Sequence, residues 1–159
     1  MSALPAAAGG IAVSRALRVV AGRSEAREDL LAFTGRMYPG YQAAPHHRRI
    51  AEALEAVERG DTRRLIVTLP PRHGKSLLAS QHFPAWFLGR GPDRRIIACS
   101  YAASLAYRFS RLARNLLSEP GWPWPEVRTA SDLAQVQRWD IAGRRGGYIA
   151  AGVGGGITG

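Results

Sequence analysis

The residues best suited to chemistry are Gly74, Lys75 and Ser76, which end the run Pro70-Pro71-Arg72-His73-Gly74-Lys75-Ser76. A glycine followed by lysine and a hydroxyl residue closes the phosphate-binding loop pattern of nucleotide-binding proteins. That pattern has another glycine five residues earlier, where this chain has Leu69. The match is therefore partial, and it predicts nucleoside triphosphate binding only if neighbouring elements support it.

The lysine content supports a special role for Lys75. Lysine and arginine together number 22, and Lys75 is the only lysine. The planar fork of arginine cannot replace a compact ammonium group between phosphate oxygens. Because the chain uses arginine at every other basic position, the lysine at position 75 indicates that the geometry there requires a compact ammonium group.

The segments on either side of the loop are of the kinds that flank a phosphate-binding loop, a strand before it and a helix after it. The apolar run 64–69 predicts a buried strand, and Ser76-Leu77-Leu78-Ala79 predicts the start of a helix. The unpaired N–H groups and the dipole of a helix start favour an anion there. Gly74 would let the backbone approach phosphates, Lys75 would reach the β- and γ-phosphates, and Ser76 would hold Mg²⁺. The alternative is an ordinary strand-to-helix turn that needs a glycine.

Two other loop residues have open roles. Arg72 could contact the γ-phosphate as charge develops there, or it could be a solvated loop arginine. His73 is better explained as a loop filler than as a catalyst. Ser100, at the end of a second predicted strand, lies where open α/β sheets bind ligands.

The rest of the chain predicts an α/β fold with a parallel sheet flanked by helices. We expect a helix over 24–37 capped by Ser24, and a helix from Pro45 to Gly60. The helix after the loop should kink or restart at Pro84 and end at Gly89. The remaining predicted elements are a strand over 95–100, a helix over 103–117, and a hairpin of 139–141 and 148–150 joined through 143–147.

Composition narrows the class of protein. The 159 residues fit one domain, and 46% hydrophobic with 21% charged residues is a globular balance. No apolar stretch approaches the roughly 18 residues that cross a bilayer, so we expect no membrane contact. The single cysteine, Cys99, favours a reducing compartment.

The net charge and the N-terminal residues each have two interpretations, one about the partner and one about the N-terminal segment. The net charge of +10 favours a nucleic-acid partner, although a general bias towards arginine would explain it too. Residues 1–23 contain no acid. We expect a flexible N-terminal arm there, with an organelle transit peptide as the alternative.

Hydrolysis requires an acid that the predicted strands lack. Nucleotide hydrolysis of this type uses an acidic residue at the end of a second apolar strand, to hold Mg²⁺. Neither 65–69 nor 96–100 ends in Asp or Glu, and nothing after Tyr148 supplies one. The sequence therefore predicts nucleotide binding without efficient hydrolysis.

The chain from Tyr41 to Gly159 resembles the N-terminal ATPase part of a tailed-phage terminase large subunit. The resemblance depends on motifs in the right order: residues 44–50 (Ala-Pro-His-His-Arg-Arg-Ile), 65–76, 83–89 (Phe-Pro-Ala-Trp-Phe-Leu-Gly), 97–101 and 152–159. It implies a P-loop ATPase fold and a loop that often lacks the first glycine, which accounts for Leu69.

The same resemblance implies the ligands and partners. ATP and Mg²⁺ would bind at Pro71, Arg72, His73, Gly74, Lys75 and Ser76. Arg72 would act on the γ-phosphate and Gln42 would recognise adenine, with His46 or His47 as the alternative. Double-stranded DNA, a terminase small subunit, a portal protein and a homo-oligomeric ring on the portal are implied partners, in the bacterial host cytoplasm.

Family members continue past the Gly-Ile-Thr-Gly run into an apolar strand closed by acids, the Walker B strand, and then into a nuclease domain. We therefore expect 24–159 to be a partial ATPase domain without the nuclease. Two rival readings are a helicase-like translocase and an inactive nucleotide-binding stub. Arg108, Arg111 and Arg114 recur along one helix stripe and could contact the DNA backbone, or they could form a solvated face.

Overall fold

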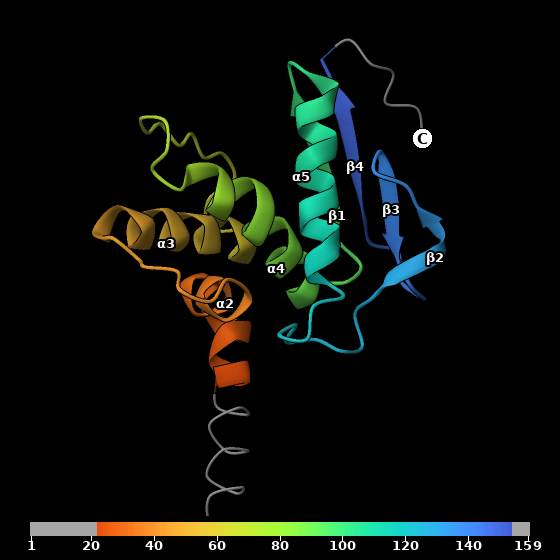
Figure 1. Cartoon of the computed structure of the whole chain (residues 1–159), viewed down its shortest axis with the longest axis horizontal. Helices are drawn as coiled ribbons and strands as arrows, with labels where there is room; N and C mark the ends of the chain where they lie inside the picture. The colour runs from red at the N-terminus through yellow and green to blue at the C-terminus, as the bar shows by residue number, and fades with distance from the viewer. Residues whose placement is uncertain (1–21, 154–159) are drawn as a thin grey trace, which may run out of the picture.

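The computed structural model describes residues 22–153 and shows an α/β architecture (Figure 1). Residues 22–28 are helical. The elements that follow are α2 (Leu30–Met37), α3 (Pro45–Arg59), the π-helical segment η1 (Leu77–His82), α4 (Phe83–Arg90), β1 (Arg95–Ser100), α5 (Ala103–Leu116), β2 (Thr129–Ala134), β3 (Arg138–Ile141) and β4 (Gly147–Gly152). Within these residues, every helix is too short or too polar to span a bilayer.

The sheet is mixed, which corrects the prediction of a parallel sheet. Its strand order is β1-β4-β3-β2. Strands β1 and β4 are parallel, whereas β3 is antiparallel to both of its neighbours. The predicted hairpin is confirmed as β3 and β4, and its tight turn has Gly143 at a φ of 66°. The two strands of a hairpin are antiparallel by geometry, so a sheet in which one of them pairs parallel with β1 must be mixed.

Residues 64–69 form no strand, so that prediction is wrong. β1 is an edge strand, and two adjoining hollows lie between it and this segment. Ile66 is 89% exposed. An apolar run forms a strand only where a neighbour satisfies its N–H and C=O groups, and β1 pairs with β4 but not with this segment.

The helices form two groups in Figure 1. α5 lies along the sheet and contacts β1 and β4, while α2, α3, η1 and α4 pack together on the other side of α5. The predicted helices over 45–60 and 103–117 are confirmed. Pro45 occupies the first turn of α3, and Gly60 ends it with a left-handed φ of 86°.

The single helix predicted over 24–37 is divided at Asp29, and its cap differs from the prediction. Ser24 lies inside the helical residues 22–28, and Asp29 caps α2 by accepting a hydrogen bond from the Ala32 N–H at 2.7 Å. Asp29 has extended backbone angles and a side chain able to accept, which is what a cap requires. The predicted arm lies outside the described residues apart from Gly22 and Arg23.

The helix after the loop changes its hydrogen bonding near Pro84, as predicted. The Phe83 N–H bonds to the Leu78 carbonyl, five residues back, which makes η1 a π-helical segment. The helix ends at Arg90, one residue after the predicted Gly89. Gly89 is a buried contact point, because a Cβ there would lie 2.4 Å from the Trp124 ring.

Aromatic side chains fill the core. Phe33 packs edge-on against His82 and Trp122, with ring centroids 6.0 and 5.9 Å apart. In the sheet, Trp139 stacks on Tyr148 at 5.4 Å, and the Trp139 indole N–H bonds to the buried Ser110 hydroxyl. These contacts join α2, η1, α5 and the strands into one body that supports the loop at residues 70–76.

Candidate nucleotide-binding site

The loop at residues 70–76 connects the extended segment 64–69 to the helix that contains η1. Residues 71–74 form turns, and helical structure begins at Lys75. The Leu78 N–H bonds to the Gly74 carbonyl at 3.1 Å, which places Gly74 at the start of the helix. The first N–H groups of a helix have no partner within it, so those of Lys75, Ser76 and Leu77 are available to a ligand.

The backbone of the loop has an unusual conformation at two alternate residues. Arg72 has a φ of 65° and Gly74 has a φ of 74°. Arg72 is the only non-glycine residue with a positive φ between residues 22 and 153. Turns that include left-handed residues bring successive N–H groups together into concave anion sites. A strained non-glycine residue in such a loop is also an indication of function.

The loop encloses a hollow of about 440 Å³, which is lined by residues 69–77 alone. Lys75 and Ser76 both line it. Ser76 also lines hollows of about 410 and 620 Å³ on the side towards β1, and Ser100 lines the larger of these. A group held by Ser76 would therefore lie where the loop hollow meets the space in front of the sheet.

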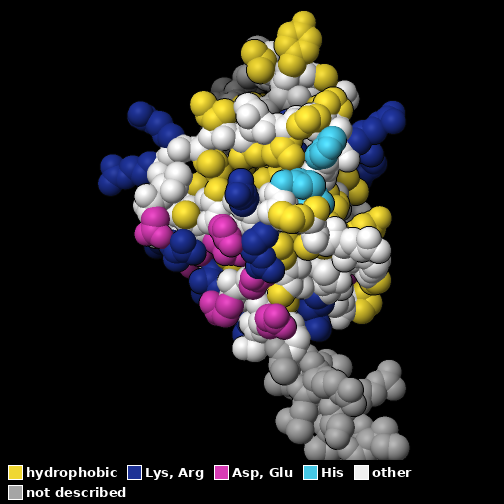
Figure 2. Space-filling model, turned by 90° about the vertical axis from the view of Figure 1, so that its left-hand side faces the viewer, with side chains coloured by type: hydrophobic (Ala, Val, Ile, Leu, Met, Phe, Trp, Pro, Cys, Tyr) yellow, Lys and Arg dark blue, Asp and Glu magenta, His cyan; other side chains and the backbone are white. Residues whose placement is uncertain are grey.

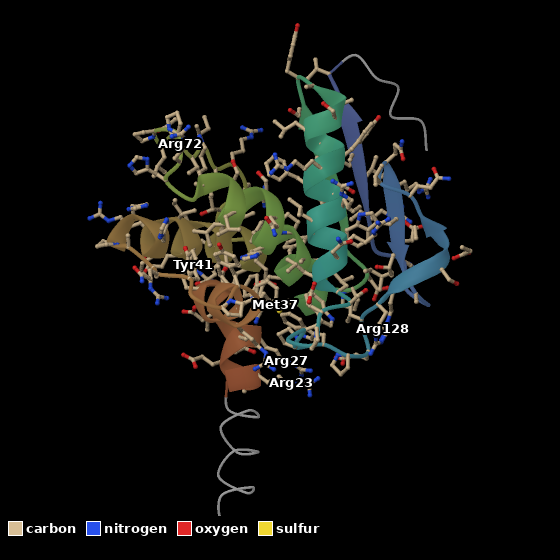
Figure 3. All side chains as sticks on the ribbon, viewed as in Figure 1. Arg23, Arg27, Met37, Tyr41, Arg72 and Arg128 are labelled. Carbon is tan, nitrogen blue, oxygen red and sulfur yellow. The ribbon has the colours of Figure 1, made fainter. Side chains whose placement is uncertain are left out.

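The structure brings the contiguous site residues together around one hollow, whose lining does not include Gln42. Residues 71–76 all line the loop hollow. Figure 3 shows Arg72 on the projecting loop, far from the helices around α2. Gln42 is exposed in the segment before α3, and it lines none of the hollows that Ser76 lines.

The histidines before the loop lie against it. The His46 and His47 ring centroids are 4.0 Å apart, and His46 is 5.8 Å from His73. The His47 Nε2 atom is 3.2 Å from the His73 carbonyl oxygen. Sequence reasoning named His47 only as an alternative for adenine recognition and missed this contact. The position of His47 in the first turn of α3 signals its bond with the Ala44 N–H, but no local signal reports its contact with the loop.

Tyr41 packs beside these histidines. Its ring centroid is 5.5 Å from that of His47. Burial raises the pKa of the Tyr41 phenol, and its hydroxyl is buried without a hydrogen-bond partner among the described residues. Figure 3 shows Tyr41 between α2 and α3. The tyrosine therefore presents an aromatic surface, in its neutral form, under the histidine pair.

The electrostatic character of the site is basic. Lys75 and Arg63 line the 410 Å³ hollow, and none of the described Asp or Glu residues lines that hollow or the hollows of 440 and 620 Å³. Residues 22–153 hold no group of three or more His, Cys, Asp or Glu side chains that could bind a metal by themselves. The arrangement suits an anion, and a cation would enter together with that anion.

The predicted basic stripe on α5 is only partly free. Arg108 and Arg111 are exposed. Arg114 is half-buried and donates a hydrogen bond to the Ala134 carbonyl of β2. Two of the three arginines are therefore available to a partner, and the third ties α5 to the sheet edge.

Comparison with protein-family models, with curated proteins and with solved structures finds no match to this chain. The case for function therefore depends on the loop itself and on the resemblance described above.

Proposed function

We propose that this protein binds ATP with Mg²⁺ at residues 70–76, as the ATP-binding part of a viral DNA-packaging terminase large subunit. The observation that carries the proposal is the loop conformation. Left-handed residues 72 and 74 curve the backbone around a hollow that ends at a helix start, with the only lysine of the chain beside it. That combination supplies converging N–H donors and one compact positive charge.

Each residue of the loop has a distinct part in this proposal. The amides from Gly74 onward would hold the phosphates, and the Lys75 ammonium would reach the β- and γ-phosphates. The Ser76 hydroxyl would hold Mg²⁺, which, when bound, neutralises charge on the phosphate oxygens. Arg72 projects from the loop, where its guanidinium could fold over a γ-phosphate.

The chemistry proposed for the described residues is binding. Hydrolysis needs a carboxylate near the metal, and none of the described acids lines the hollows at Ser76. In an intact terminase of the proposed kind, ATP hydrolysis would drive double-stranded DNA into a viral shell. That proposal includes three further partners: a small subunit, a portal protein and a homo-oligomeric ring on the portal. The net charge of +10 supports the DNA-binding part of the proposal.

The experiment is nucleotide binding by variants of Lys75. A fluorescent ATP analogue with Mg²⁺ should bind the unaltered protein, and Lys75→Ala should weaken binding by at least about tenfold at unchanged stability. Lys75→Arg should also weaken it, because the guanidinium fork does not fit between phosphate oxygens. Arg144→Ala is the matched control, since it removes one exposed charge in the turn between β3 and β4. Equal binding by the unaltered protein and Lys75→Ala would contradict the proposal.

A further inference from the structure

His47 joins the start of α3 to the phosphate-binding loop through both nitrogens of its ring. Its Nδ1 atom accepts a hydrogen bond from the Ala44 N–H at 3.0 Å. Its Nε2 atom lies 3.2 Å from the carbonyl oxygen of His73. An amide N–H can only donate, so Nδ1 must carry a lone pair. The proton of the neutral ring is then on Nε2, which donates to His73.

The same ring also lies against Gly74. A Cβ at residue 74 would be 2.5 Å from the His47 Nε2 atom, and Gly74 has a φ of 74°. Both the space and the backbone conformation therefore require glycine there. His47 thus contacts the two residues that directly precede Lys75, one through a hydrogen bond and the other through close packing.

Among the described residues outside the loop, His47 is the side chain that bonds to the loop backbone. Among residues 22–153, the His47 ring is the only side chain beyond 70–76 that hydrogen-bonds to a loop residue. The other side-chain bond is internal, between His73 Nδ1 and the Pro71 carbonyl at 2.8 Å. His46 and Tyr41 flank the His47 ring, and Figure 2 shows histidine side chains gathered among hydrophobic ones on this face.

We propose that His47 is a positioning residue for phosphate binding, which holds the backbone of residues 73 and 74 in the conformation that receives the anion. This inference rests on the proposed function of the loop. The physical reason is entropic, because a loop that is already fixed by His47 loses less conformational freedom when a phosphate binds. The ring also couples the loop to the N-terminus of α3, so a shift of either one moves the other.

Two substitutions separate this role from simple helix capping. His47→Asn keeps an acceptor near the position of Nδ1, so it can cap Ala44, but it is too short to reach His73. His47→Gln places an amide donor near the position of Nε2. Positioning predicts that the Asn variant binds the fluorescent ATP analogue about tenfold more weakly than the unaltered protein, and that the Gln variant binds more tightly than the Asn variant. Capping alone predicts that the two variants bind the analogue equally well, because both amides keep an acceptor for the Ala44 N–H.

The result that overturns the proposal is binding by the Asn variant that equals or exceeds that of the Gln variant. Urea unfolding midpoints for both variants would show that each one is folded. If Lys75→Ala abolishes binding while both His47 variants bind normally, the proposed function survives and only the positioning role fails.

A second measurement does not depend on nucleotide. Nitrogen-15 NMR of the imidazole distinguishes a ring protonated on Nε2 from one protonated on Nδ1. The geometry predicts the Nε2–H form for His47 in the free protein. The Nδ1–H form would overturn the inference even if the protein bound no ATP analogue, whereas the Nε2–H form without any binding would count against the proposed function alone.

Discussion

The Glu58 carboxylate of α3 accepts a 2.6 Å hydrogen bond from the guanidinium of Arg94, the residue directly before β1. A second arginine, Arg90, lies 3.2 Å from its other oxygen. The Glu58 side chain is only 5% exposed, so these two partners compensate for a buried charge. The triad joins the helix that precedes the loop to the end of α4 and to the sheet.

Substitution of Glu58 tests how much its contacts with Arg90 and Arg94 stabilise the fold. Burial alone would raise the pKa of Glu58, but the hydrogen bond from Arg94 and the ion pair with Arg90 outweigh it and lower the pKa. Ionised Glu58 therefore stabilises the fold above its usual pKa of about 4.3, and that stability is lost as pH falls through the lower folded value. Glu58→Gln should cost about 2 kcal/mol at neutral pH in urea unfolding.

The control for Glu58 is Glu28→Gln. Glu28 bonds to the same Arg90 at 2.9 Å, but its side chain is 75% exposed. Exposed ion pairs contribute little, so the expected loss is below about 1 kcal/mol. Equal losses for the two variants would show that burial does not set the strength of the Glu58 contacts.

The buried His82 should make the stability of the fold depend on pH in a second way. Burial lowers the pKa of His82 to about 4, and its Nδ1 atom has no hydrogen-bond partner among the described residues. A histidine that is neutral when folded but protonates near pH 6.5 when unfolded favours the unfolded state as pH falls. Stability from this group is complete above about pH 6.5 and is lost down to about pH 4, by about 3 kcal/mol in all.

His82→Phe should flatten that part of the pH profile. The ring already packs edge-on against Phe33, so an aromatic replacement keeps the contact while removing the titrating group and the unpaired nitrogen. Unfolding midpoints at several pH values between about 4 and 7 would measure the slope. The same slope in the variant and the unaltered protein would assign the dependence to other groups.

The sequence predicted most of the helices because their signals are local. Pro45, the spacing of Ile50 and Leu54, and Gly60 together define α3. The run 64–69 has an equally clear local pattern, yet pairing requires a neighbouring strand, and no local signal reports that. β2 was missed for a related reason, since Thr129–Ala134 is an irregular edge strand without β-branched enrichment.

The candidate site also has a part that local sequence predicts and a part that depends on tertiary packing. Residues 71–76 were predictable because they are contiguous and match a known pattern. The contact of His47 with His73 and Gly74 joins residues 26 or more positions apart, so it depends on how α3 packs against the loop. The strained φ of Arg72 was also beyond sequence reasoning, because arginine has no preference for that conformation.

Ser76 gives a prediction about the metal. If its hydroxyl holds Mg²⁺, Ser76→Ala should remove most of the increase in ATP-analogue affinity that Mg²⁺ produces, about tenfold, without changing binding in EDTA. Ser80→Ala is the matched control, because Ser80 lies one turn later and lines the same two hollows towards β1. An unchanged Mg²⁺ effect in Ser76→Ala would remove the hydroxyl from the metal site.

The exposed arginines of α5 give a prediction about DNA. Arg108 and Arg111 are one helical turn apart and free to contact phosphates, whereas Arg114 is tied to Ala134. The double variant Arg108→Ala with Arg111→Ala should weaken duplex binding for all sequences and lower the slope of log K against log salt by about 0.9 for each lost phosphate contact. Arg114→Ala removes a charge from the same helix but should leave that slope unchanged. Equal slopes for the double variant and the unaltered protein would show that this face of α5 is solvated instead, because screening acts on every phosphate contact that a cation makes.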